Sequence, residues 1–182
     1  MPVSIQPYLL VLTGASGSGK TTLVRALAGR RRMGVCTYHF DSIGVPSREA
    51  IVAEFGSREG WQEAKTREWI ERLARNPDAA AVMVLEGQMR PGVVRAAWAG
   101  HHEVRGTVAL VDCSAEARRR RLAGTPRELE LATAEMDEWG IYLRGQAVEL
   151  DLPIIETSRR TLPESLNELE ALLRRLTGAA IR

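Results

Sequence analysis

The sequence predicts an α/β fold built on a parallel sheet, and three observations carry that prediction. Short apolar, β-prone runs alternate along the chain with longer segments whose apolar residues recur at helical spacing. The strand-like runs are apolar throughout, which is typical of parallel strands buried on both faces. The length, 182 residues, is that of one ordinary domain. We therefore expect βαβ units in a single domain over residues 1–182, with helices on both faces of the sheet.

In the N-terminal half, turn and capping residues separate each expected element from the next. Gly14 ends the first apolar run, the basic cluster Arg30 to Arg32 suits a helix C-terminus, and Ser47 can cap the helix that follows it. Asn76-Pro77-Asp78 supplies a stop and a turn. The expected elements are a strand over Tyr8 to Thr13, a helix from Lys20 to near Gly29, a strand over Val35 to Phe40, a loop over Asp41 to Ser47, and a long surface helix over Ser57 to Arg75.

The C-terminal half continues this alternation. Thr161 and Glu164 match a capping box, and the leucines that follow recur at helical spacing, so the closing helix should pack against the core. The expected elements are strands over Ala80 to Leu85 and Thr107 to Val111 with the segment Val93 to Trp98 between them, helices over Ala115 to Leu122 and Arg127 to Leu150 with a break near Gly124 to Pro126, a brief fifth strand over Pro153 to Ile155, and the closing helix after Thr161.

Composition excludes several classes of protein. Hydrophobic residues make up 45% and charged residues 26%, which is the usage of a globular protein rather than a disordered one. Lys and Arg total 25 against 23 Asp and Glu, so net charge gives nucleic-acid binding no support. Met1 to Gln6 lacks the pattern of a signal peptide, and no apolar run approaches the ~20 residues that span a membrane. We expect a cytoplasmic protein in which Cys36 and Cys113 are buried, reduced thiols.

The octapeptide Gly14 to Thr21 is the strongest functional signal in the chain. It reads GASGSGKT and fits G-x-x-x-x-G-K-[ST] between an expected strand and an expected helix, where this phosphate-binding P-loop belongs. Small residues let backbone N–H groups surround a phosphate, and the helix N-terminus adds partial positive charge. Lys20 should reach the β- and γ-phosphates, and Thr21 should ligate Mg²⁺. The expected nucleotide-binding residues are Gly14, Ala15, Ser16, Gly17, Ser18, Gly19, Lys20, Thr21 and Thr22.

Asp41 follows the second expected strand at the sheet edge where ligands bind in open α/β folds. A carboxylate there can take the proton from an acceptor hydroxyl, which makes Asp41 the candidate general base and a substrate contact. The alternative is a turn residue acting with Ser42 and Gly44.

Glu86 ends the third expected strand at the same edge. An acidic group there can hold Mg²⁺ through water or contact the substrate, and the alternative is a cap on the helix that follows Pro91. Gln88 and Arg90, just beyond, are further candidates for substrate contact.

The run Arg118 to Arg121 begins inside an expected helix, so Arg118 and Arg121 share one face. Phosphoryl transfer uses cations that close over the reacting group and exclude water, and Gly124-Thr125-Pro126-Arg127 offers a lid-like break. Arg118, Arg121 and Arg127 are therefore candidate catalytic cations of a lid over about residues 118–130. The alternative is a solvated basic face.

Other titratable and aromatic residues give no functional pattern. The three histidines, His39, His101 and His102, show no metal-binding spacing and are expected to be structural or exposed. Trp139 and Tyr142 are expected to pack against the sheet.

These residues together resemble the small P-loop kinases of the adenylate, shikimate and gluconate kinase type, with polynucleotide-kinase-like and chloramphenicol-phosphotransferase-like relatives. The resemblance covers nearly the whole chain. Its residues are the loop Gly14 to Thr21, the strand ends Phe40-Asp41-Ser42 and Leu85-Glu86-Gly87, the run Arg118 to Arg121, and the closing Ile155 to Ser158.

The resemblance implies a five-stranded parallel sheet of order 2-3-1-4-5, a small lid, and ATP and Mg²⁺ as cofactors. It also implies that Asp41 acts as the base, that lid arginines lie within Arg118 to Arg121, and that Thr157-Ser158-Arg159 lies beside the adenine. The acceptor-binding helices would occupy about residues 47–76, where four cations either bind an anionic acceptor or face solvent. These cations are Arg58, Lys65, Arg67 and Arg72.

The expected function is ATP- and Mg²⁺-dependent transfer of the γ-phosphoryl group to a hydroxyl or phosphate of a small-molecule acceptor. Two alternatives stay open: a nucleotide-driven regulatory ATPase or switch, and a polynucleotide 5′-hydroxyl kinase, which needs a basic groove. The glycine-rich substrate loop of shikimate kinases and the nucleoside-monophosphate signatures of adenylate kinases are both missing. The sequence therefore leaves the acceptor, and the oligomeric state, open.

Overall fold

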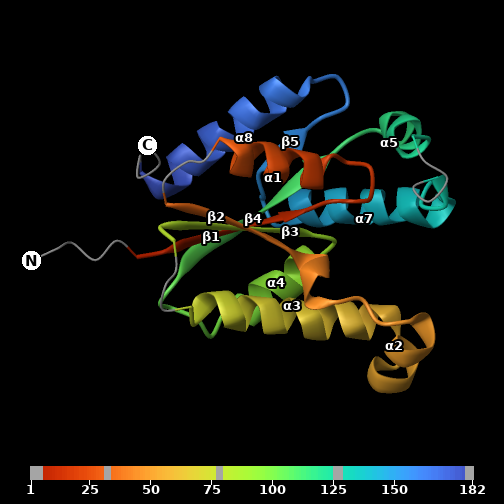
Figure 1. The fold of residues 1–182 in the computed structure, drawn as a ribbon, viewed down its shortest axis with the longest axis horizontal. Coiled ribbons are helices and arrows are strands. Elements are labelled where there is room, and N and C mark those ends of the chain that lie inside the picture. Colours follow the sequence, from red (N-terminus) through yellow and green to blue (C-terminus); the bar gives the residue numbers. More distant parts are fainter. Residues whose placement is uncertain (1–5, 31–33, 77–79, 125–128, 179–182) are drawn as a thin grey trace, which may run out of the picture.

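The computed structural model describes residues 6–30, 34–76, 80–124 and 129–178. Five parallel strands form one sheet in the order β2-β3-β1-β4-β5 (Figure 1). This confirms the predicted fold class and strand order. The strands are β1 (Tyr8–Thr13), β2 (Val35–His39), β3 (Val82–Gly87), β4 (Arg105–Asp112) and β5 (Ile154–Glu156). All residues of the central strand β1 are buried, because both faces of the sheet are covered.

Helices cover the two faces of the sheet, with α1 and α8 on one side and α3 and α4 on the other (Figure 1). Helix α7 packs against Leu110 of β4 and contacts α4, on the same side as α3. The helices are α1 (Lys20–Gly29), α2 (Arg48–Phe55), α3 (Arg58–Ala74), α4 (Pro91–Trp98), α5 (Ala115–Leu122), α7 (Ala134–Glu149) and α8 (Leu162–Thr177), with a 3₁₀ turn, η1 (Phe40–Ile43), after β2. Alternate residues of the strands point to the two cores: Leu10 and Leu12 pack with α1 and α8, whereas Leu9 and Val11 pack with α3.

Side-chain caps set several helix ends. As predicted, the Ser47 side chain accepts a hydrogen bond from the Ala50 N–H at the start of α2. Ser57, which was not predicted as a cap, does the same for Gly60 at the start of α3. Thr161 and Glu164 form the predicted capping box of α8.

Three predictions of local structure are wrong. The long helix α7 begins at Ala134 instead of Arg127, because Thr133 caps it by accepting from the Met136 N–H. Cys36 is exposed instead of buried, because β2 is an edge strand. Tyr142 is 41% exposed, because its ring stacks on Trp139 instead of packing on the sheet.

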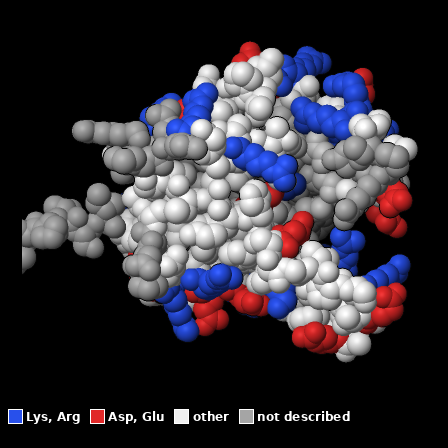
Figure 2. Space-filling view, viewed as in Figure 1, with Lys and Arg blue, Asp and Glu red and all other residues white. Residues whose placement is uncertain are grey.

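Charged side chains of both signs are interspersed over the face shown in Figure 2, with a notch on the right between the regions of α2 and α5. No helix in the described parts of the chain combines the length and apolar character that crossing a membrane requires.

Candidate active site

Two glycines determine the path of the P-loop between β1 and α1. Gly17 and Gly19 have φ angles of 77° and 95°, in the left-handed region that favours glycine. A Cβ on Gly17 would also lie 2.8 Å from Cγ of Arg118 on α5. Gly19 is the N-cap of α1, and no side chain in the described chain caps that helix, so its first N–H groups are open to an anion.

The interior of the loop also fits a phosphate. Ser18 Oγ is buried, and it has no hydrogen-bond partner among the residues that the structure describes. Buried hydroxyl groups in native proteins are normally paired, so an unpaired one at an open helix N-terminus suits a bound oxyanion.

Lys20 lies inside this loop and is only 7% exposed. Its Nζ donates a hydrogen bond to the carbonyl oxygen of Ala15 at 3.0 Å. Burial lowers the pKa of Lys20 to about 8, although the nearby Glu86 and Asp41 carboxylates oppose that effect. A desolvated ammonium group with few partners is well prepared to meet phosphate oxygens.

Thr21 and Glu86 place oxygen ligands beside the loop. The Thr21 hydroxyl lies 3.1 and 3.2 Å from the two carboxylate oxygens of Glu86, which is 6% exposed at the end of β3. Hydroxyl and carboxylate oxygens are what Mg²⁺ prefers, and this ion usually takes one or two carboxylates together with substrate phosphates. The Thr21 hydroxyl and the Glu86 carboxylate could together supply such oxygens, and no group of three or more His, Cys, Asp or Glu that could hold a metal occurs among the described residues.

Asp41 lies in η1, directly beyond β2, where its surroundings raise the pKa of the carboxyl. The Asp41 side chain reaches solvent, but the surrounding protein removes part of its hydration. This desolvation is the main cause of the raised pKa. The Glu86 carboxylate adds to the effect, while Lys20, Arg58 and His39 oppose it. The structure therefore brings Asp41 within electrostatic reach of Lys20 and Glu86, as predicted from the strand ends.

Three of the four cations considered for the acceptor helices have partners on α3 itself. Lys65 pairs with Glu68 at 2.7 Å, Arg67 pairs with Glu63 at 2.8 Å, and Arg72 lies 5.3 Å from the centre of the Trp69 ring. Arg58 is exposed at the start of α3 and acts on the Asp41 carboxyl. Arg58 is thus the member of this set within electrostatic reach of Asp41.

Gln88 and Arg90 connect the P-loop to α3 through Gln62, which the sequence analysis missed. Gln88 Nε2 donates to Ser16 Oγ at 2.9 Å, and the Gln88 carbonyl accepts from Gln62 Nε2 at 2.5 Å. Arg90 donates to Gln62 Oε1 at 3.1 Å and lies 5.2 Å from the centre of the Trp139 ring. The contacts with Gln62 and Trp139 hold the Arg90 side chain in place. Because Arg90 forms no ion pair within the described ranges, no carboxylate there neutralises its charge.

Arg118 and Arg121 have different partners, although they lie on one helix. Arg121 donates to the carbonyl oxygens of Gly17 and Ser18, at 3.2 and 3.3 Å, and to Thr157, so it links α5 to the P-loop and to the end of β5. Arg118 is 4% exposed and pairs with Asp137 at 2.6 Å. Arg127 lies outside the described residues, as does part of the lid predicted over 118–130.

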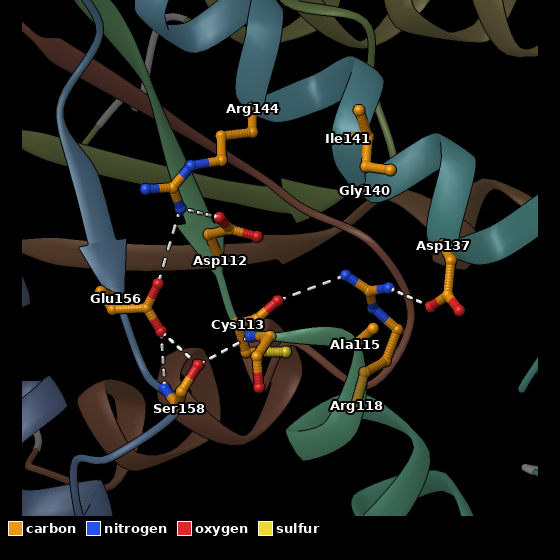
Figure 3. Close-up of a pocket in the computed structure, with 11 residues that line it drawn as sticks. Asp112, Cys113, Ala115, Arg118, Asp137, Gly140, Ile141, Arg144, Glu156 and Ser158 are labelled. Carbon is orange, nitrogen blue, oxygen red and sulfur yellow. Dashed lines mark hydrogen bonds and ion pairs between the residues drawn. The ribbon is translucent and has the colours of Figure 1, made fainter.

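A cavity of about 300 Å³ separates α5 from α7 at the ends of β4 and β5. Figure 3 shows Arg144 directed at Asp112 and Glu156, and Arg118 directed at Asp137 and the Cys113 carbonyl. These charges are largely paired with one another. The pairs of Arg144 with Asp112 and Glu156 connect α7 to the ends of β4 and β5.

Sequence reasoning missed one residue in direct contact with the predicted metal ligands. His39 Nδ1 lies 2.7 Å from Glu86 Oε1, because the parallel register of β2 and β3 places His39 beside Glu86. The signal was present in the two strand ends, but it required knowledge of which strands are neighbours. Asp112 was missed in the same way at the end of β4, where it pairs with Arg144.

No family model and no curated protein matches the sequence. Solved structures match nearly all of it. A shikimate kinase from Acinetobacter baumannii in complex with shikimate is 15% identical, with a TM-score of 0.60 over 97% of this chain and 96% of that one. A gluconokinase from Sinorhizobium meliloti is 19% identical, with a TM-score of 0.63 over 95% of each chain.

A sugar kinase from a Janibacter species is also 19% identical, with a TM-score of 0.61 over 96% of this chain and 97% of that one. At these identities the likeness shows the fold alone. The predicted resemblance to small P-loop kinases is confirmed at that level.

Proposed function

We propose that this protein transfers the γ-phosphoryl group of ATP, with Mg²⁺, to a hydroxyl or phosphate group of a small molecule. One observation carries the proposal: the phosphate-binding Lys20, the Thr21–Glu86 pair and Asp41 meet at the carboxyl edge of one sheet. Phosphoryl transfer needs these components in one place, namely a phosphate cradle, a metal site and a base. The fold alone would not support it, since this architecture hosts many activities.

In this proposal the loop Gly14 to Thr22, which includes Lys20, holds the nucleotide phosphates. The adenine ring would lie beside Thr157 to Arg159. Thr21 and Glu86 would hold Mg²⁺, which supplies positive charge to the phosphate oxygens during transfer. Arg118, Arg121 and Arg127 would act from a lid over about 118–130, and Arg121 already contacts the P-loop carbonyls.

The acceptor would lie between the helices of residues 47–76 and the segment that carries Gln88 and Arg90. As its hydroxyl oxygen bonds to the γ-phosphorus, Asp41 takes the hydroxyl proton, and the bond from the γ-phosphorus to the bridging oxygen breaks, releasing ADP. The raised pKa of Asp41 strengthens it as a base relative to an ordinary carboxylate. A phosphate acceptor that is already ionised would not need this proton transfer.

The decisive experiment is product analysis with the full chain. The protein is incubated with Mg²⁺ and ATP or GTP, together with sugars, nucleosides, nucleotides or hydroxylated antibiotics, and phosphorylated products are identified by mass spectrometry. The matched control is Asp41→Asn, which keeps the size of the side chain and removes its basicity. A product that forms with the wild type and not with this variant supports the proposal.

Two results would replace the proposed kinase function with another. Release of free phosphate without an acceptor, increased only by a partner protein, indicates a regulatory ATPase. A product formed only on 5′-hydroxyl oligonucleotides, with transfer falling steeply as salt rises, indicates a polynucleotide kinase.

A further inference from the structure

Glu86 is a buried carboxylate that receives two hydrogen bonds from different parts of the fold. One comes from the Thr21 hydroxyl at the start of α1, and the other from His39 Nδ1 at the end of β2, 2.7 Å from Oε1. The His39 side chain is 39% exposed, whereas that of Glu86 is 8% exposed. The histidine therefore lies between the buried carboxylate and solvent.

In the tautomer with its proton on Nδ1, the His39 ring donates a hydrogen bond to Glu86 Oε1, since an ionised carboxylate only accepts hydrogen bonds. This contact is the shorter of the two, since the Thr21 hydroxyl lies 3.1 and 3.2 Å from the two carboxylate oxygens.

We infer that His39 is a positioning residue that holds the Glu86 carboxylate in place for the divalent cation. The inference rests on the proposed function, in which the Thr21 oxygen and Glu86 share the cation. The Thr21 hydroxyl would then have to serve the cation as well as Glu86, whereas His39 has no such second duty. Partners that orient a ligand in this way typically contribute about 10- to 100-fold in metal affinity.

The contact is not required for the fold. Backbone pairing along β2 and β3 sets the register that brings His39 beside Glu86, and this pairing does not involve the ring. Replacing the ring should therefore change the metal site while the sheet persists.

The test measures ADP binding by isothermal titration calorimetry, with Mg²⁺ and again with a chelator and no metal. His39→Ala should weaken binding about 10- to 100-fold with Mg²⁺ and leave metal-free binding, which depends on the P-loop, unchanged. His39→Asn carries an N–H close to the position of Nδ1 and should restore most of the loss. The matched control is His101→Ala, which removes a histidine that also contacts a carboxylate, Glu103, at 3.2 Å outside the site.

Three outcomes would overturn the inference. If His39→Ala binds Mg-ADP as the wild type does, the positioning role is removed. If it loses metal-free and metal-dependent binding equally, the role is structural. If ADP binding by the wild type does not depend on Mg²⁺ at all, the proposed metal site itself fails, and this result is distinguishable because it requires no variant.

Discussion

The proposed phosphate side, around Gly14 to Thr21, and the proposed acceptor side, around Asp41 and Arg58, are built in opposite ways at the same edge of the sheet. On the phosphate side Ser18 is 1% and Lys20 7% exposed, and a Cβ on Gly14 would lie 2.3 Å from the Val111 carbonyl oxygen. On the acceptor side Asp41 and Arg58 are exposed, and Ile51 is the buried residue of α2. Few substitutions would fit on the phosphate side, whereas many would fit on the acceptor side.

This difference explains which part of the function can be inferred from the residues. Close packing around the phosphate cradle makes its residue types recognisable in the sequence. The proposed acceptor side consists largely of solvent-facing side chains on η1, on α2 and at the start of α3, so many of these can change without harm to the fold. The class of reaction is therefore easier to infer than the acceptor.

The largest effect should come from Asp41, the proposed base on the open side. Asp41→Asn should reduce transfer to a hydroxyl acceptor by about 10²- to 10⁴-fold and leave nucleotide affinity unchanged. Because the pKa of Asp41 is raised, kcat of the wild type should fall with decreasing pH at a value above the 3.8 of an ordinary aspartate. Single-turnover rates across the pH range measure the loss in the variant and the pH at which the wild-type rate falls. A loss of nucleotide binding in the variant would instead make Asp41 structural.

The buried side should show a conflict between function and stability. Lys20→Met should lower transfer by about 10²- to 10³-fold, and in the absence of nucleotide it should stabilise the fold by up to about 3 kcal/mol. The reason is that the pKa of Lys20 is about 8 when folded and 10.5 when unfolded, so burying its charge costs free energy below that range.

For the same reason the free energy of unfolding of the wild type should rise between about pH 8 and pH 10.5, and Lys20→Met should lack this rise. Urea unfolding of both proteins at several pH values measures it. A variant less stable than the wild type at pH 7 would show that Lys20 supports the fold.

A smaller effect is expected where the two sides meet, at Arg90. Arg90→Leu should raise KM for an anionic acceptor about 10-fold, since one charge-assisted hydrogen bond contributes roughly 1.5–3 kcal/mol, and should leave KM for ATP unchanged. Steady-state kinetics with both substrates varied separates the two constants, and Arg95→Leu on α4 serves as the control. Equal changes in both KM values would assign Arg90 to the nucleotide.

The smallest effect is expected at a helix cap on the acceptor side. Ser57→Ala removes the hydrogen bond to the Gly60 N–H and should lower stability by about 1 kcal/mol. Thermal unfolding measures the loss, and stabilisation by Mg-ADP should persist. If that stabilisation disappears, α3 contributes to the nucleotide site and the contrast between the two sides is wrong.

Local signals predicted much of the fold. The run Tyr8 to Thr13, the P-loop and the capping box at Thr161 each depend on residues close together in the chain, and each was recognised. The strand order came from resemblance instead, because nothing in the spacing of the strands specifies which of them are neighbours.

Features that depend on distant neighbours were missed. The exposure of Cys36 follows from β2 being an edge strand, and the role inferred for His39 follows from the β2–β3 register. Arg118 could be placed on a helix from the sequence, but its partner Asp137 comes from α7, and the spacing did not specify how the two helices pack. Such contacts become visible only when the elements are assembled.

The edge position of β2 gives the molecule a built-in attachment point for a spectroscopic probe. The chain has two cysteines, and only Cys36 is exposed, on the strand that leads to His39 and Asp41, whereas Cys113 is 4% exposed and burial raises the pKa of its thiol. A maleimide fluorophore should therefore label one site without any engineered cysteine. The label would sit on the strand that precedes His39 and Asp41, so its emission can be followed while candidate acceptors are added.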